Sequence, residues 1–138
     1  MFKIVIASHG PFAAAMRESL KLFFPEENDI ITVSIGEDGL ASFQKRMDQA
    51  VNSVKGENVL FLADLPYGTP FNEIVKRMSL VGKDSEILAG VNMPTLIEAV
   101  NLKNQGFSVE KAVPKLFESS KLQSYTEKLN SLGNADDE

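Results

Sequence analysis

The stretch that decides the fold is residues 2–11, FKIVIASHGP, near the start of the chain. Its first six residues are apolar apart from one lysine and include several β-branched side chains, which is typical of a strand covered on both faces. Pro11 suits the first turn of a helix, where its missing N–H costs nothing. The stretch therefore predicts a buried strand that passes directly into a helix, with Ser8, His9 and Gly10 at the junction.

The same pattern of a strand followed by a helix recurs along the chain. Apolar runs predict further strands at residues 30–35, 58–63 and 86–91, and helical spacing of apolar side chains predicts helices over about 12–23, 40–54, 71–81 and 94–103. Four alternations of strand and helix indicate right-handed βαβ units. We therefore expect an α/β fold with a doubly wound, mostly parallel sheet and helices on both faces.

The C-terminal part of the chain has a less definite pattern. Ser108 suits the cap of a short helix, which Pro114 is expected to interrupt. Spaced leucines further along allow another helix, whereas residues 121–126 fit a short strand equally well. Residues 133–138, GNADDE, have the composition of an acidic tail. We expect one domain over residues 1–132, followed by that tail.

The rarest residue types constrain the chemistry most. The 138 residues include no cysteine and one histidine, His9, and the 14 basic and 19 acidic side chains give a net charge of −5. This composition excludes disulfides, thiol nucleophiles and metal sites built on two imidazoles. The acidic balance argues against a nucleic-acid partner, and no segment approaches the roughly 20 apolar residues of a membrane span. We expect a cytoplasmic protein without a metal, a nucleic-acid partner or membrane insertion.

Two chemistry-bearing side chains follow predicted strands. His9 comes after the first strand and Asp64 after the third. In an open parallel sheet, ligands bind beyond the carboxyl ends of the strands, where the strand order reverses. The flavodoxin-like order makes the first and third strands neighbours, so the two side chains would emerge together. Position alone also fits a structural histidine and a turn-capping aspartate, since both are common at strand ends.

Glycines beside these side chains favour an anion at the same edge. Gly10 and Gly68 each precede a predicted helix start, where free N–H groups and the helix dipole favour phosphate. Thr69 adds a hydroxyl next to Gly68, and Gly36 lies in the loop after the second strand. These residues predict a phosphoryl-binding site made without a metal.

The same site suits a phosphoryl group carried on His9. Neutral imidazole is a nucleophile at physiological pH. A carboxylate that accepts a hydrogen bond from one ring nitrogen selects the tautomer and leaves the lone pair of the other nitrogen exposed. We predict that Asp64 has this orienting role and that Thr69 contacts the phosphoryl oxygens.

Three blocks of sequence resemble a known family: IVIASHG at residues 4–10, FLAD running into GTPFN over 61–72, and LAGVNMP at 88–94. Together they resemble the mannose-family (mannose/fructose/sorbose type) enzyme IIA domain of the bacterial phosphoenolpyruvate-dependent sugar phosphotransferase system. The resemblance runs in register over residues 1–103 and more loosely to 132. Residues 65–68, LPYG, replace a stretch in which the family has paired glycines.

The resemblance implies a fold, a reaction and partners. The fold would be flavodoxin-like, in a homodimer whose subunits exchange an antiparallel edge strand. The chain would be a phosphotransferase without a cofactor, taking a phosphoryl group from the carrier protein HPr and passing it to enzyme IIB, and so indirectly to the membrane components IIC and IID. His9 matches the phosphorylated histidine, Asp64 its hydrogen-bonding acid, and Thr69 a serine or threonine beside the phosphoryl group.

Other interpretations remain. A receiver-like or regulatory signalling module would use Asp64 as the phosphoacceptor, but Ser8 and His9 stand where a receiver needs its acidic Mg²⁺ ligands. A flavin or nucleotide module needs a phosphate loop that the first strand end does not provide, and a histidine-phosphatase-like hydrolase needs a second histidine. The phosphotransfer subunit of a dihydroxyacetone kinase system, a relative of the same fold, is also an alternative.

Overall fold

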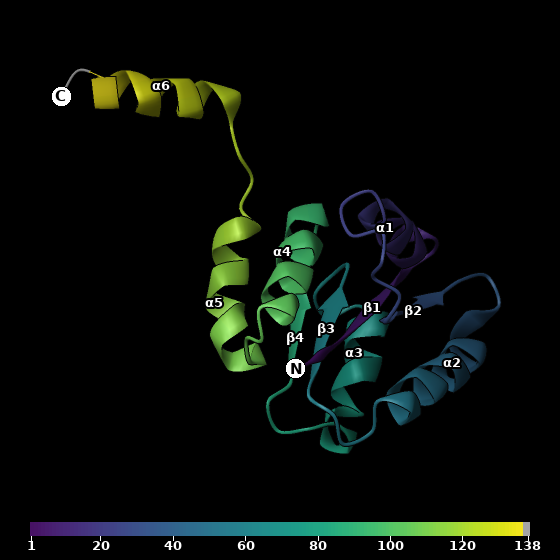
Figure 1. Ribbon diagram of the computed structural model, residues 1–138. Coiled ribbons are helices and arrows are strands. Elements are labelled where there is room, and N and C mark those ends of the chain that lie inside the picture. The colour runs from purple at the N-terminus through teal and green to yellow at the C-terminus, as the bar shows by residue number, and fades with distance from the viewer. Residues whose placement is uncertain (137–138) are drawn as a thin grey trace.

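The strand β1 (Lys3–His9) lies inside a four-stranded parallel sheet in the computed structural model, which describes residues 1–136 (Figure 1). The strand order is β2-β1-β3-β4, and the other strands are β2 (Ile30–Ile35), β3 (Val59–Ala63) and β4 (Glu86–Ala89). Every pair is parallel. The α/β prediction with a parallel sheet is confirmed.

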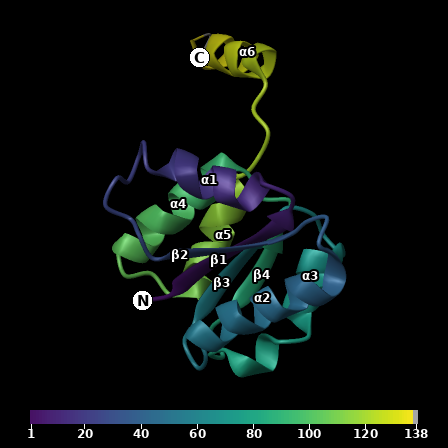
Figure 2. The same ribbon diagram turned by 90° about the vertical axis from the view of Figure 1, so that its right-hand side faces the viewer.

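Within residues 1–136, six α-helices and one 3₁₀ turn connect and cover the strands. They are α1 (Phe12–Leu20), α2 (Gly39–Ser53), α3 (Thr69–Val75), the 3₁₀ turn η1 (Met78–Leu80), α4 (Met93–Asn104), α5 (Val109–Ser119) and α6 (Tyr125–Asp136). The helices α1, α4 and α5 pack on one face of the sheet, and α2 and α3 pack on the other (Figure 2). Among the residues described, none of these helices has the length and apolarity needed to cross a bilayer.

The apolar run of β1 explains why the sheet has two cores. Ile4 and Ile6 point toward α1, α4 and α5, whereas Val5 and Ala7 point toward α2, because successive side chains of a strand alternate between faces. All four side chains are almost completely buried. A strand that faces two cores cannot alternate apolar and polar residues, so its sequence reads as one continuous apolar run.

The prediction that Pro114 interrupts the helix after Ser108 is wrong. Pro114 lies inside α5, whose buried residues Val109, Ala112 and Leu116 form one apolar stripe. Proline removes one backbone hydrogen bond, but it stands on the exposed side of the helix. Burial of the apolar stripe on the opposite side therefore stabilises the helix enough for it to continue past Pro114. Ser108 does cap it, because its side chain accepts the amide of Lys111.

The helix predicted over 71–81 is two shorter elements. It begins two residues early, at Thr69, because Gly68 is extended and Pro70 is compatible with the first turn. It ends at Val75, and the chain continues through η1. This earlier start brings the beginning of α3 to the carboxyl edge of the sheet.

The C-terminal segment is helical. Residues 121–126 form no strand, because α6 begins at Tyr125. Figures 1 and 2 show α6 held away from the body by an extended linker. The helix continues to Asp136, so the predicted tail is helical over residues 133–136, and its last two residues, 137–138, lie outside the described part. The exchanged edge strand and the division at residue 132 stay predictions.

Candidate functional site

His9 and Asp64 meet at the carboxyl edge of the sheet. Strands β1 and β3 are neighbours, with Ala7 paired to Ala63, so the residues just beyond this pair emerge side by side. His9 Nδ1 lies 2.9 Å from Asp64 Oδ2, and the same oxygen accepts the backbone N–H of His9 at 2.9 Å. The topology thus brings together the two residues that the sequence singled out.

The carboxylate of Asp64 is held on both oxygens. Its Oδ1 accepts the amide of Leu65 at 2.9 Å, while its Oδ2 serves His9. A carboxylate only accepts hydrogen bonds, so the proton between the two side chains belongs to Nδ1 of His9. This tautomer leaves the lone pair on Nε2. The imidazole is 45% exposed and the carboxylate 13%, so the ring is open to a partner while its anchor is nearly covered.

Gly68 lies beside the imidazole, too close to leave room for a Cβ. A Cβ built on Gly68 would lie 3.0 Å from Cε1 and 3.5 Å from Nε2 of His9. The backbone of Gly68 is extended, a conformation open to any residue. The glycine is therefore required by the ring beside it and not by its own dihedral angles. Thr69, the first residue of α3, follows directly, one residue from the ring contact.

Gly10 and Gly36 lie on the other side of the site, toward β2. Gly10 has a φ of +60° and donates its amide to the carbonyl of Ile35 at 2.8 Å. Ile35 is the strand partner of His9, so Gly36 follows immediately beyond the position opposite the histidine. Gly10 and Gly36 therefore border the histidine at the end of the strand pair β1 and β2.

Ser8 has a role that sequence reasoning missed. Its side chain is completely buried, and its Oγ accepts the amide of Ala13 at 2.8 Å in the first turn of α1. The amide of Ala13 is thus already occupied, which leaves fewer free donors at the start of α1 than the sequence suggested. A hydroxyl residue just before a helix is a common cap signal, but here the intervening residues 9–11 disguise it.

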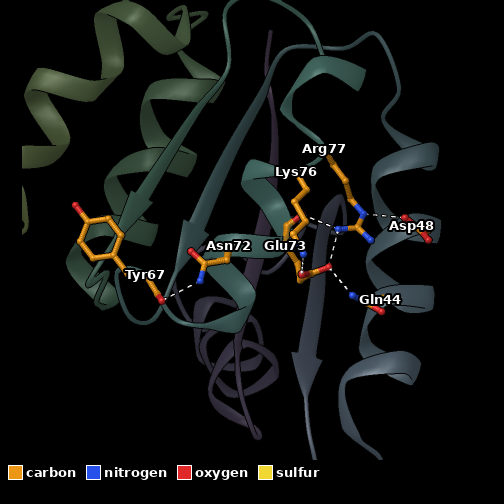
Figure 3. Close-up of polar contacts among 7 residues, drawn as sticks. All are labelled: Gln44, Asp48, Tyr67, Asn72, Glu73, Lys76 and Arg77. Carbon is orange, nitrogen blue, oxygen red and sulfur yellow. Dashed lines mark hydrogen bonds and ion pairs between the residues drawn. The ribbon is translucent and has the colours of Figure 1, made fainter.

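The loop between β3 and α3 contains an uncommon backbone conformation. Tyr67 has a φ of +62°, and it is the one residue other than glycine with a positive φ among those described. A side chain in this left-handed region costs of order 1–3 kcal/mol. The carbonyl of Tyr67 accepts a hydrogen bond from the side-chain amide of Asn72 at 3.0 Å (Figure 3). The Tyr67 ring also meets the Phe71 ring edge-on, with 5.3 Å between the ring centroids. Tyr67 belongs to the segment 65–68, where the resemblance implies paired glycines.

An ionic cluster around the buried Glu73 attaches α3 to α2. Glu73 is 3% exposed, and its carboxylate accepts hydrogen bonds from Gln44, Lys76 and Arg77 (Figure 3). Arg77 also pairs with Asp48 of α2 at 2.7 Å. The hydrogen bond from Lys76 does most to lower the pKa of Glu73 below its ordinary value, while burial acts in the opposite direction. Sequence reasoning missed this cluster, although the spacing of residues 73, 76 and 77 fits ion pairs on one helical face.

We expect Glu73→Gln to lower the free energy of unfolding by about 1–3 kcal/mol at neutral pH, because charged hydrogen bonds are lost in a buried place. The pKa of Glu73 is lowered in the folded chain, so the ionised group stabilises the fold above its unfolded pKa, which is about 4.5. That contribution is lost as the pH falls through the folded pKa.

Urea unfolding of both chains at about pH 7 and about pH 3 tests this dependence. The difference between wild type and variant should shrink at the lower pH. Glu118→Gln removes an exposed carboxylate paired with Lys121 and is the matched control, with an expected change of about 0–1 kcal/mol. A Glu73→Gln effect that is equal at both pH values would contradict an ionised Glu73 in this role.

Comparison with known proteins matches the chain to one family. Residues 3–117 match the family model described as PTS system fructose IIA component. The fructose-specific EIIA component of Bacillus subtilis is 36% identical over 107 residues, which are 75% of this chain and 71% of that protein. The sorbose-specific EIIA component of Lacticaseibacillus casei is 28% identical over 108 residues, covering 77% of this chain and 78% of that protein.

Solved structures agree with these sequence matches. The phosphotransferase system component EIIA from Streptococcus agalactiae superposes with a TM-score of 0.80 at 26% identity, over 92% of this chain and 99% of that one. The mannose/sorbose-specific IIA subunit from Enterococcus faecalis gives a TM-score of 0.76 at 26% identity, over 89% and 97% of the two chains. The range matched by the family model contains every residue of the site described above.

Proposed function

The chain belongs to the family of fructose IIA components of the sugar phosphotransferase system, and we propose that within this system His9 is the residue that carries the phosphoryl group. The observation that carries the proposal is the orientation of the imidazole. Its Nδ1 is engaged by Asp64, while the ring as a whole is nearly half exposed. Nε2 is therefore the nucleophile that an incoming partner meets.

The proposed transfer needs two displacement steps. In the first, the Nε2 lone pair of His9 forms a bond to the phosphorus of phosphohistidine on HPr, and the P–N bond of HPr breaks and returns its electron pair to the imidazole of HPr. The phosphorylated His9 ring keeps its proton on Nδ1, where Asp64 balances the positive charge that develops. In the second, a nucleophile of enzyme IIB takes the phosphoryl group, and His9 recovers its lone pair.

The backbone around His9 supports binding of the phosphoryl oxygens. Gly68 lies against the ring edge that holds Nε2, and Thr69 follows with an amide and a hydroxyl. Gly10 and Gly36 border the same end of the sheet. We propose that these four residues contact the transferred group, in keeping with catalysis by positioned donors without a metal.

The partners follow from the reaction. We propose HPr as the donor and enzyme IIB as the acceptor, with the membrane components IIC and IID served indirectly through IIB. A relay of this kind needs all its soluble carriers in one compartment, so we place the chain in the cytoplasm. An acceptor in a dihydroxyacetone kinase system is the alternative that the same site would allow.

We also propose a homodimer, supported by an uncovered edge of the sheet. Strand β4 ends the strand order, and a cavity of about 310 Å³ lies beside it, lined also by Leu116 and Phe117 of α5. Phe117 is 60% exposed, and α6 presents Leu129 and Leu132 to solvent. A second copy that exchanges its C-terminal segment would cover the β4 edge and the exposed apolar side chains of α5 and α6. Sedimentation equilibrium should give twice the chain mass of 15.1 kDa, and a monomer at all concentrations would contradict the exchange.

A reconstituted reaction tests the proposed function. Phosphoenolpyruvate, enzyme I and HPr should together label the chain, and omission of HPr should prevent labelling. The label should be lost in acid and survive base, because a phosphohistidine behaves in this way. A label that base removes would instead indicate an acyl phosphate on Asp64, as in a receiver-like module. Transfer of the label to enzyme IIB, and not to a dihydroxyacetone kinase, would distinguish the sugar phosphotransferase system from the dihydroxyacetone kinase system.

We expect Gly68→Ala to slow labelling by phospho-HPr several-fold while leaving the thermal midpoint nearly unchanged. The backbone of Gly68 accepts any residue, so the added methyl group conflicts only with the imidazole of His9, which must move by a few tenths of an ångström. A displaced ring weakens its hydrogen bond to Asp64.

Stopped-flow or quenched labelling beside a thermal melt measures both properties. Gly133→Ala, in α6 and with open space around the new methyl group, is the matched control. Equal labelling rates for wild type and Gly68→Ala would show that the contact with the ring has no part in transfer.

A further inference from the structure

Asn72 makes two hydrogen bonds to the loop that contacts His9. Its backbone amide donates to the carbonyl of Gly68 at 2.9 Å, as the first bond of α3, and its side-chain amide donates to the carbonyl of Tyr67 at 3.0 Å. Two successive peptide carbonyls of the loop therefore point to one residue. Figure 3 shows the Asn72 side chain extending to the backbone of Tyr67, well apart from the cluster around Glu73.

The hydrogen bond from the Asn72 side chain is accepted by a residue whose backbone is strained. Tyr67 is in the left-handed region, with a φ of +62°, which a residue with a Cβ adopts only when its surroundings impose it. The Tyr67 side chain is 79% exposed, so burial does not hold it in place. The bond to its carbonyl is thus a principal restraint on this backbone conformation, and the edge-on contact with Phe71 adds to it.

The conformation of Tyr67 determines where Gly68 lies. Gly68 is the next residue, and it lies so close to the His9 ring that an added Cβ would stand 3.0 Å from Cε1 and 3.5 Å from Nε2. The other ring nitrogen, Nδ1, is hydrogen-bonded to Asp64. The imidazole therefore lies between two supports: Asp64, which directly follows β3, and Gly68 of the loop. If Tyr67 relaxed to a negative φ, the peptide joining it to Gly68 would turn and the second support would move.

We propose that Asn72 is a positioning residue for the phosphoryl carrier: by holding Tyr67 in its left-handed conformation, it keeps Gly68 against His9 and so fixes the direction of Nε2. The proposal rests on the function proposed above for His9. Among the described residues, the hydrogen bonds that Asn72 donates go to the loop and none goes to the His9 ring. Its side chain lies on the surface of α3, outside both cores of the sheet, so its removal leaves those cores intact.

The test measures both the transfer rate and, by NMR, the position of the His9 ring. Asn72→Ala should lower the rate constant for transfer from phospho-HPr by about tenfold, in the range found for residues that orient a reacting group from a distance. The nuclear Overhauser contact between His9 Hε1 and the Gly68 α-protons should be present in wild type and lost in the variant. Asn72→Leu, which keeps the size of the side chain without its N–H groups, should behave in the same way.

A rescue variant separates positioning from a loss of folding. Glycine takes a positive φ without strain, so Tyr67→Gly added to Asn72→Ala should restore the Overhauser contact and most of the rate. Asn52→Ala, on the exposed side of α2, is the control and should match wild type. Circular dichroism should show the same helix content in every chain.

Each outcome decides the proposal. Loss of rate and contact in Asn72→Ala, with recovery of both in the double variant, supports it. A rate within about twofold of wild type, a slow variant that keeps the contact, or a double variant as slow as Asn72→Ala would overturn it. If wild type took no label from phospho-HPr, the function proposed for His9 would fail, and the Overhauser contacts of the three chains would still decide whether Asn72 positions the ring.

Discussion

A chain with His9→Ala is expected to take no phosphoryl group from phospho-HPr, because the substitution removes the one imidazole that the sequence contains. No other side chain of this chain could form a phosphohistidine in its place. The loss should therefore be complete, not partial. Of the changes considered, this one has the largest expected effect.

The fold of the His9→Ala chain should survive. His9 is the last residue of β1, and its backbone amide, which donates to Asp64, is unchanged by the substitution. The side chain is 45% exposed and contributes nothing to either core. A thermal melt beside the labelling reaction should show a cooperative transition close to that of wild type. Label retained by a folded His9→Ala chain would refute the assignment.

Asp64→Asn is expected to lower the rate constant for transfer by about 10–100-fold, in the range found for residues that orient a reacting group. The amide that this substitution introduces has one oxygen where the carboxylate has two, and its NH₂ group is a donor. When that donor faces Nδ1 of His9, it favours the tautomer that carries its proton on Nε2, which removes the nucleophilic lone pair. The charge that balances the phosphorylated ring is lost as well.

Kinetics distinguish this role from partner binding. The rate constant should fall while the KM for phospho-HPr changes little, since Asp64 is nearly covered and acts on the ring. Asp29→Asn is the matched control: it removes a carboxylate paired with Lys3 on the surface and should transfer at the wild-type rate. A lower affinity for phospho-HPr with an unchanged rate constant would show that Asp64 serves docking instead of orientation.

The sequence was sufficient to predict the sheet and the meeting of His9 with Asp64. The run FKIVIA is apolar on both sides because β1 faces two cores, and this property is visible in one dimension. Parallel strands place their carboxyl ends at one edge, so the neighbours β1 and β3 bring the two side chains to 2.9 Å. The local sequence pattern and the strand topology therefore both predicted a site at this edge of the sheet.

The features that the sequence did not reveal depend on tertiary placement. The Glu73 cluster requires α2 and α3 to lie on the same face of the sheet, at a distance of 29 residues between Gln44 and Glu73. The left-handed Tyr67 is not a residue that predicts a positive φ, because that signal belongs to glycine. Pro114 lies within α5 because of a buried stripe whose partner, α4, comes earlier in the chain.

The position of the phosphoryl group on the histidine ring shows which atom of the chain is the nucleophile. The chain has a single histidine, so nitrogen-15 and phosphorus-31 spectra of the phosphorylated protein report on one pair of ring nitrogens. We predict a phosphoryl group on Nε2 and a proton on Nδ1, bonded to Asp64. A phosphoryl group on Nδ1, or an unmodified ring in a protein labelled on a carboxylate, would show that Nε2 of His9 is not the phosphoryl carrier.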